Sequence, residues 1–115
     1  MRCLLVDDSE AFLASATRLL ESQGLEVLGC ASSGRDALEL DEQLEPDVVL
    51  VDVQLAEEDG IELGRQLAAR RPDAHVILIS TRSEDELADL LDGRPAARCL
   101  PKSSLGAAAI ERLLG

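Results

Sequence analysis

Aromatic residues are almost absent from this sequence. It has no tryptophan and no tyrosine, and its one phenylalanine is Phe12. The hydrophobic residues, which make up 46% of the chain, are therefore almost all aliphatic. Such a share is typical of a globular protein, so we do not expect disorder. At 115 residues the chain has the length of one domain with a single compact body.

Basic residues and long apolar runs are also scarce. The 11 lysines and arginines are outnumbered by 23 aspartates and glutamates, which gives a formal net charge of -12. Because such a domain repels phosphate backbones and anionic lipids, we expect it to bind neither nucleic acid by itself nor a membrane. No apolar stretch is long enough for a signal peptide or a membrane span. The acidity can serve solubility alone, or part of it can form a cation site.

Cysteine occurs only as Cys3, Cys30 and Cys99, and no Cys-x-x-Cys motif is present. The single histidine has no cysteine beside it, so we expect neither a zinc site nor a disulfide framework. Isolated thiols of this kind fit a reducing compartment. The sequence therefore indicates a cytoplasmic protein.

Short apolar runs rich in β-branched residues predict the strands. They cover residues 3–6, 27–31, 48–51 and 76–79, and a shorter run at 98–100 is a candidate edge strand. The third and fourth runs are apolar without interruption, which is typical of strands buried on both faces of a parallel sheet.

Segments with helical spacing of apolar residues separate these runs. The first should end at Gly24, the third should begin at a cap on Asp59, and the fourth should begin at the capping box Ser83-x-x-Glu86. The fifth should extend over about 104–114. The apolar faces predicted for the first three helices are Phe12, Ala16, Leu19 and Leu20; Ala37, Leu40 and Leu44; and Ile61, Gly64, Leu67 and Ala68.

A strand followed by a helix, five times in succession, predicts an α/β fold. The expected form is a (βα)5 doubly wound parallel sheet with right-handed crossovers. Residues 1–115 contain no linker, repeat or low-complexity segment and are predicted to form one domain. In this architecture ligands bind beyond the carboxyl ends of the strands, where the strand order reverses. The residues that follow the strands are therefore the candidates for a functional site.

Charged and hydroxyl side chains follow four of the predicted strands. Asp7 and Asp8 follow the first, Asp52 the third, Ser80 the fourth and Lys102 the fifth. Three carboxylates in one crevice would repel one another unless a cation lay among them. A hard divalent ion such as Mg²⁺ or Mn²⁺ suits this set of oxygen ligands.

Each of these residues also has a purely structural interpretation. An Asp-Asp pair often starts a helix, a buried lysine often forms a plain ion pair, and the Ser80 hydroxyl could be a cap. Together, however, the Lys102 ammonium and a hydroxyl around a metal-bound carboxylate are the donors that phosphoryl transfer needs. This combination predicts Asp52 as a nucleophile.

A resemblance to a known family follows from the order of these residues. The set that carries it comprises Asp7-Asp8, Asp52 at the end of Val48-Val49-Leu50-Val51, Asp59-Gly60, Ser80 and Lys102. Over almost its whole length the chain resembles the receiver domain of two-component response regulators, which has a CheY-like sheet of order 2-1-3-4-5. The segment Leu100-Pro101-Lys102-Ser103 is similar to receivers that precede helix-turn-helix DNA-binding domains of the NarL/FixJ kind. We expect no output domain within these 115 residues.

The resemblance implies a phosphoacceptor in signal transduction rather than an enzyme. Asp52 would accept a phosphoryl group from a sensor histidine kinase or a phosphotransfer protein, and Ser80 and Lys102 would contact that group. The ligands of Mg²⁺ would be Asp7, Asp8, Asp52 and the backbone carbonyl of Gln54.

The resemblance also implies how the phosphoryl state is timed and used. Gln54 and Arg82 correspond to positions that border the path of the hydrolytic water, so we expect them to tune the lifetime. Phosphorylation would change a protein–protein interaction, for example a homodimer formed through the last helices. In a longer chain it would control an output domain for transcription regulation.

Two residues depart from the family pattern. Ala56 stands where the family usually has proline, which affects the loop after Asp52 rather than the chemistry, and Cys99 stands where the family usually has an aromatic residue that takes part in the switch. A thiol has no ring to move, so we expect a weak or helix-borne conformational change. Partners or self-association would then use Leu105, Ala108 and Ile110. A receiver-like domain that acts through contacts alone, without phosphorylation, stays open as an alternative.

Two other functions compete for this fold. A phosphatase of the haloacid-dehalogenase type needs an Asp-x-Asp motif, but Gln54 lies two residues after Asp52 and Ser9 lies two residues after Asp7. A flavodoxin-like domain would need aromatic rings for a flavin or a Gly-rich phosphate loop. Phe12 is the only aromatic residue and no such loop is present, so the sequence favours the receiver.

Overall fold

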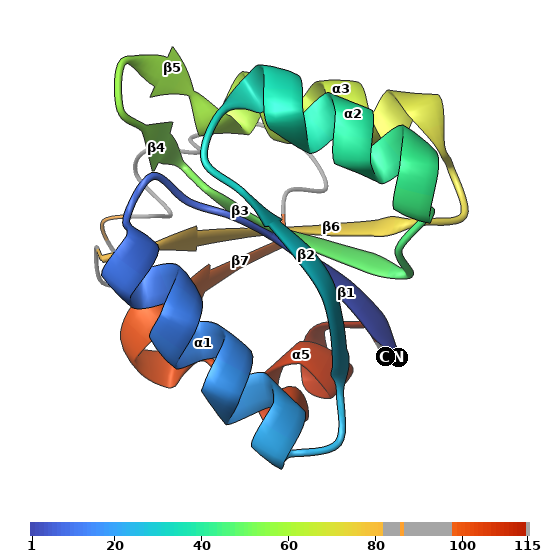
Figure 1. Ribbon diagram of the computed structural model, residues 1–115. Helices are drawn as coiled ribbons and strands as arrows, with labels where there is room; N and C mark the ends of the chain where they lie inside the picture. Colours follow the sequence, from blue (N-terminus) through green and yellow to red (C-terminus); the bar gives the residue numbers. More distant parts are fainter. Residues whose placement is uncertain (82–85, 87–97, 115) are drawn as a thin grey trace.

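The structure is a computed structural model that describes residues 1–81, 86 and 98–114. Its centre is a sheet of five parallel strands (Figure 1). The strands are β1 (Arg2–Val6), β2 (Glu26–Ala31), β3 (Val48–Asp52), β6 (His75–Ser80) and β7 (Arg98–Pro101). They lie in the order β2-β1-β3-β6-β7, which confirms the predicted parallel sheet and its 2-1-3-4-5 order.

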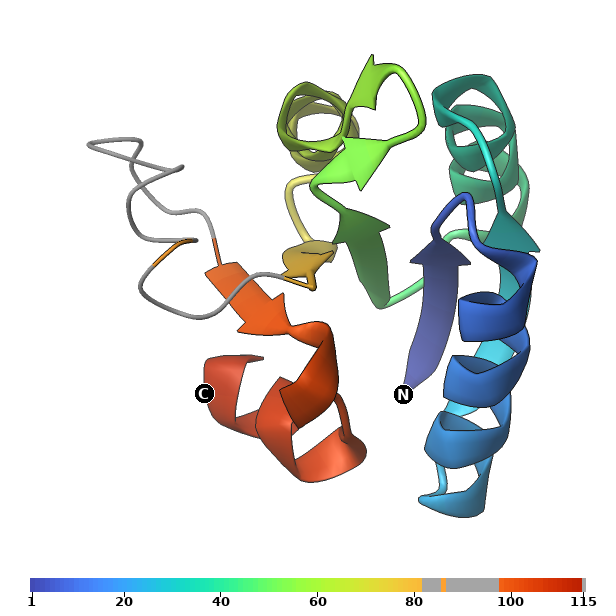
Figure 2. The ribbon, with the colours of Figure 1, turned by 90° about the vertical axis from the view of Figure 1, so that its left-hand side faces the viewer.

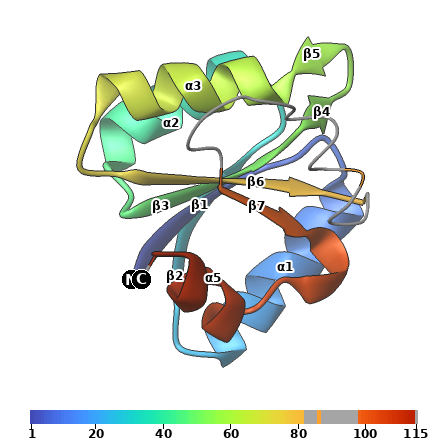
Figure 3. The same cartoon turned by 180° about the vertical axis from the view of Figure 1, so that it is seen from behind.

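Helices cover both faces of the sheet. Helices α1 (Glu10–Ser22) and α5 (Ala107–Leu114) lie against one face, and α2 (Gly34–Leu44) and α3 (Gly60–Arg70) lie against the other. The two layers are visible from the front, from the side and from behind (Figure 1, Figure 2 and Figure 3). Apart from Glu86, the predicted fourth helix lies outside the described residues. Among the helices that are described, none is long and apolar enough to cross a membrane.

Two aliphatic cores result, because alternate side chains of a strand point to opposite faces of the sheet. In β1, Cys3 and Leu5 join the core beneath α1 and α5, whereas Leu4 and Val6 join the core beneath α2 and α3. All residues of β3 are buried, as its uninterrupted apolar run predicts. Burial raises the pKa of the Cys3 thiol to about 11, so this side chain stays protonated and packs as a small apolar group.

The structure corrects the predicted apolar faces of two helices. In α1, Leu13 is buried, whereas Leu19 is 39% exposed. In α3, Leu63 is buried and Ala68 is exposed. Successive helical residues point about 100° apart, so a one-residue error in choosing the stripe moves a side chain from the core to the surface.

The last helix begins later than predicted. A 3-10 turn, η1 (Lys102–Ser104), comes first, and α5 starts at Ala107. The Ala107 N–H donates to Oε1 of Gln23 at 2.6 Å, so a side chain at the end of α1 satisfies a donor of the first turn of α5. Ile110 has no exposed surface, so the expectation that it belongs to a self-association surface is wrong. Ala108 is exposed.

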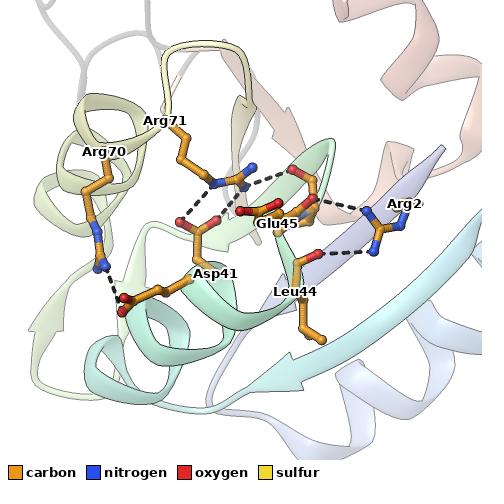
Figure 4. A network of polar contacts seen from close by, with 8 residues as sticks. Arg2, Asp41, Leu44, Glu45, Arg70 and Arg71 are labelled. Carbon is orange, nitrogen blue, oxygen red and sulfur yellow. Dashed lines mark hydrogen bonds and ion pairs between the residues drawn. The ribbon is translucent and has the colours of Figure 1, made fainter.

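A buried ion pair lies near the end of the sheet where β1, β3 and β6 begin (Figure 4). Arg71, which follows α3, donates from Nη2 to Oδ1 of Asp41 on α2 at 2.7 Å and to the carbonyl of Pro46 at 2.9 Å. Asp41 is only 2% exposed. The guanidinium of Arg2 donates to two carbonyls at the carboxyl end of α2. Local spacing predicts none of these contacts, because the paired residues are 25 or more positions apart in the sequence.

We expect Arg71→Ala to lower the free energy of unfolding by about 3 kcal/mol, because it leaves the buried Asp41 carboxylate without its cation. Arg70→Ala is the matched control. Arg70 pairs with Glu42 at 3.4 Å on the surface, so its loss should cost about 0.5 kcal/mol or less. Urea unfolding followed by far-ultraviolet circular dichroism measures both losses, and equal losses would contradict the role assigned to the Arg71–Asp41 pair.

Candidate functional site

The carboxyl ends of four strands bring the predicted site residues together. Asp7 follows β1, Asp52 ends β3, Ser80 ends β6 and Lys102 begins the turn after β7. They meet because the strands of a parallel sheet all end at the same edge. The cleft at this edge is lined by Asp8, Asp52, Val53, Gln54, Ala56, Ser80, Thr81 and Lys102.

The Lys102 ammonium lies between two carboxylates. Its Nζ is 2.5 Å from Oδ2 of Asp7 and 3.4 Å from Oδ2 of Asp52. The lysine side chain is 14% exposed, the Asp7 side chain is 0% exposed and the Asp52 side chain is 11% exposed. Because water is largely excluded, these charges interact more strongly than charges on the surface. Lys102 therefore compensates part of the negative charge of the crevice.

The two carboxylate oxygens of Asp7 differ in their contacts. Oδ1 accepts a hydrogen bond from the Ser9 N–H at 2.8 Å. Oδ2 touches the Lys102 ammonium but in a direction that does not make a hydrogen bond. Among the buried side-chain nitrogen and oxygen atoms of the described residues, it alone lacks a hydrogen-bond partner. A buried oxygen in this position has capacity for a further cation or a water molecule.

Asp52 is held by the segment that follows it. Its Oδ1 accepts a hydrogen bond from the Gln54 N–H at 3.2 Å, and its Oδ2 faces Lys102. Burial raises the pKa of Asp52 and the nearby Asp7 charge adds to the rise, whereas the Gln54 N–H and the Lys102 ammonium oppose it. Since the net effect is a raised pKa, one lysine does not fully compensate the buried carboxylate, and a second cation would favour its charged form.

A short hairpin that the sequence did not predict follows Asp52. Strand β4 (Gln54–Leu55) pairs with β5 (Glu58–Asp59), and Ala56 in the turn has a φ of 54°. Proline is locked near −65° and cannot adopt this φ. Gly60 follows the hairpin, and a Cβ on it would lie 1.7 Å from the carbonyl oxygen of Asp52. Only glycine therefore allows α3 to begin so close to Asp52.

The acidic side chains fit a divalent cation. One oxygen from each of Asp7, Asp8 and Asp52 lies within 4.8 Å of the others. Two of the three are buried, and Asp8 is exposed at the mouth of the cleft. An all-oxygen set, with a buried oxygen of Asp7 that has no hydrogen bond, suits Mg²⁺ or Mn²⁺ rather than zinc.

The other predicted site residues lie in different places. Ser80 is 3% exposed and Gln54 is exposed, and both line the cleft. Cys99 is half-buried and packs against the core beneath α2 and α3 instead of lining the cleft. Arg82 lies outside the described residues. Val53 also lines the cleft, and it could not be predicted from the sequence, because an apolar residue carries no chemical signal of a polar site.

Comparison with known proteins places the chain in a family. The response regulator receiver domain matches residues 3–112. The response regulator GacA of Pseudomonas aeruginosa is 35% identical over 105 residues, which is 90% of this chain and 49% of GacA. The chain therefore spans about half the length of this curated relative.

Two solved structures share the fold over nearly the whole chain. The signal receiver domain of the response regulator NarL from Mycobacterium tuberculosis has a TM-score of 0.80 at 28% identity, and the match covers 99% of this chain and 96% of that one. A response regulator protein from Burkholderia pseudomallei with a phosphorylated aspartic acid, calcium ion and citrate has a TM-score of 0.80 at 25% identity, over 99% of this chain and 66% of that one. Since the family match, the relatives and the sheet order agree, the chain belongs to the response regulator receiver domain family.

Proposed function

We propose that this receiver domain accepts a phosphoryl group on Asp52 from a phosphohistidine of a sensor histidine kinase or a phosphotransfer protein. The observation that carries the proposal is the Lys102 ammonium, which lies 3.4 Å from Oδ2 of Asp52 at a cleft open to a donor. A carboxylate beside a fixed cation is a nucleophile whose product charge is already partly compensated. The site is then an acceptor that is reset after each event, rather than an enzyme with a separate substrate.

During transfer, an oxygen of Asp52 forms a bond to phosphorus while the bond between phosphorus and the donor's histidine nitrogen breaks. The imidazole takes up a proton from solvent and leaves as a neutral ring. Lys102 and the hydroxyl of Ser80 then donate to the phosphoryl oxygens and stabilise their charge. Water later hydrolyses the acyl phosphate and restores the carboxylate.

Mg²⁺ or Mn²⁺ would be held by Asp8 and Asp52 directly, by the buried Asp7 through water, and by the backbone carbonyl of Gln54. When bound, the ion would neutralise negative charge on the carboxylates and on the phosphoryl oxygens. Two observations support this assignment: the three carboxylates cluster within 4.8 Å, and the Burkholderia neighbour contains a phosphorylated aspartic acid and a calcium ion.

Gln54 and Arg82 would set the lifetime of the phosphoryl group. Gln54 is exposed and lines the cleft, two residues beyond Asp52. We assign it, together with Arg82, to the control of access by the hydrolytic water. Hydrolysis depends on how neighbouring side chains place the attacking water. Substitutions of Gln54 or Arg82 should therefore change the dephosphorylation rate more than the yield of phosphorylation.

The output of this domain would come from contacts with another protein segment in the cytoplasm. The chain spans about half of GacA, and its net charge of -12 disfavours binding of nucleic acid by this domain itself. Transcription regulation would therefore require a DNA-binding output domain in a longer chain. A homodimer through the last helices would have to use exposed residues such as Ala108, since Ile110 is buried.

A second candidate function, signalling by contacts without phosphorylation, is favoured by Cys99. This small side chain packs beneath α2 and α3, at the β7 position paired with Leu78 of β6. It has no ring that could follow a movement of Ser80. Because a switch can shift only as far as the two states differ in contacts, the change produced by phosphorylation should be small and carried by helices.

Intact-mass spectrometry tests the proposed phosphoacceptor. Incubation with Mg²⁺ and phosphoramidate should add about 80 Da to the wild-type chain, the mass of one phosphoryl group. Asp52→Ala should stay unmodified. Glu57→Ala removes an exposed carboxylate from the same hairpin and should be labelled like the wild type. An unmodified wild type, or full labelling of Asp52→Ala, would refute Asp52 as the nucleophile.

Calorimetry tests the proposed cation site. Mg²⁺ should raise the melting temperature of the wild type, because it binds the folded state and relieves repulsion among the carboxylates; at 100 times its Kd the gain is about 2.7 kcal/mol. Asp8→Ala should lose most of this gain, whereas Asp73→Ala, an exposed acid on the loop before β6, should keep it. Equal gains in all three proteins would show that the ion binds elsewhere.

Amide hydrogen exchange tests the proposed readout. Addition of beryllofluoride, a mimic of the phosphoryl group, should change protection little in β7 and more in the helical segments, because Cys99 offers no moving ring. The unliganded protein and Asp52→Ala with beryllofluoride are the references. A strong change confined to residues 98–101 would contradict a helix-borne switch.

A further inference from the structure

The only aromatic ring of the chain lies against its only lysine. Nζ of Lys102 is 4.3 Å from the centroid of the Phe12 ring. This is within the roughly 6 Å over which the face of an aromatic ring attracts a cation. We propose that Phe12 is the positioning residue for Lys102, holding its ammonium at the acidic crevice for the phosphoryl group on Asp52. The proposal rests on the proposed function of Asp52 and adds a residue to that site.

The ring of Phe12 is held in place from its backbone outward. Phe12 lies in the first turn of α1, and its N–H donates to Oγ of the cap residue Ser9 at 3.2 Å. The Ser9 N–H in turn donates to Oδ1 of Asp7, whose other oxygen touches Lys102. One side of the ring packs against the core beneath α1 and α5. Asp7, Ser9, Phe12 and Lys102 thus form a closed circuit of contacts, and the ring is placed by the same carboxylate that the lysine touches.

The Phe12 ring can attract the Lys102 ammonium without using the carboxylate oxygens that would bind a metal. Asp7 and Asp52, which touch the ammonium, are also the groups proposed to hold a divalent cation, and that cation would repel the ammonium and compete for the same oxygens. The face of Phe12 carries partial negative charge but no net charge, and it uses none of those oxygens. It can therefore retain the ammonium when the metal binds. A leucine would fill similar space without this attraction.

The composition of the chain makes the contact unusually easy to observe. Lysine labelled with ¹³C gives a single side-chain signal set, that of Lys102, and Phe12 is the single ring that can shift it. In the metal-free protein, the Lys102 Hε resonances should lie upfield of their usual position because of the ring current. Phe12→Leu should abolish that upfield shift and Phe12→Tyr should preserve it.

The kinetic arm measures Asp52 phosphorylation by phosphoramidate with Mg²⁺. Phe12→Leu should lower the rate about 2- to 5-fold, as expected for a single cation–ring attraction at a partly exposed site, and Phe12→Tyr should keep the wild-type rate. Biosynthetic replacement of phenylalanine by 4-fluorophenylalanine changes only position 12. Since fluorine weakens the negative face with little change of shape, the rate should fall in the same direction as in Phe12→Leu.

Leu13→Ala is the control for a merely structural effect. Leu13 is the next residue of α1, is buried in the same core and does not line the cleft. It should lower the melting temperature at least as much as Phe12→Leu, yet keep the Lys102 shift and the wild-type rate. Equal loss of rate in Leu13→Ala and Phe12→Leu, or an unchanged Lys102 signal in Phe12→Leu, would overturn the proposal. If phosphoramidate did not phosphorylate the wild type, Asp52 would be refuted as the acceptor. The Lys102 NMR signals would still show whether the ring holds the ammonium.

Discussion

The contact of one ammonium group with two buried carboxylates is the constraint on which the rest of this site depends. Parallel strands end at one edge, so Asp7 after β1 and Asp52 at the end of β3 come close together, and both are largely removed from water. Such charges are tolerated only with a cation nearby. Lys102 supplies one, and the raised pKa of Asp52 indicates that this cation does not offset the full effect of burial. The negative charge of the site is thus only partly compensated, which supports the proposed binding of a divalent ion and the proposed transfer of a phosphoryl group to Asp52.

The two ends of the sheet differ in their polar groups: those at the carboxyl end line a cleft, and those at the amino end form contacts between elements. At the carboxyl end, polar groups surround a cleft, and Gly60 removes a side chain so that α3 can begin against Asp52. At the amino end, Arg71 and Asp41 form a buried pair, and the Arg2 N–H donates to the Asp47 carboxylate at 2.8 Å. The second set joins α2 and α3 to the start of the sheet. Aliphatic strands between the ends keep the cleft residues in register.

The scarcity of aromatic residues gives this receiver an unusual distribution of groups around its lysine. Where related domains have a ring on the fifth strand of the sheet, β7 has Cys99, which packs beneath α2 and α3. The single ring, Phe12, is instead on α1 and lies over the Lys102 ammonium. The residue that could respond most directly to a change at Lys102 is therefore on the opposite face of the sheet from Cys99. The proposed weak response of β7 and the proposed positioning of Lys102 by Phe12 therefore involve opposite faces of the sheet.

The sequence by itself determined the sheet and the chemistry of its edge. Uninterrupted apolar runs identify strands buried on both faces, and the residues directly after them must gather at one edge, so Asp7, Asp52 and Lys102 could be predicted together. Other features depended on where helices settle on the sheet. Leu13 and Leu19 are both apolar residues of α1, but only Leu13 is buried, and Arg71 pairs with Asp41 only after α2 and α3 pack side by side. Tertiary structure decided these contacts, because periodicity reports which face of an element is apolar and says nothing about its distant neighbours.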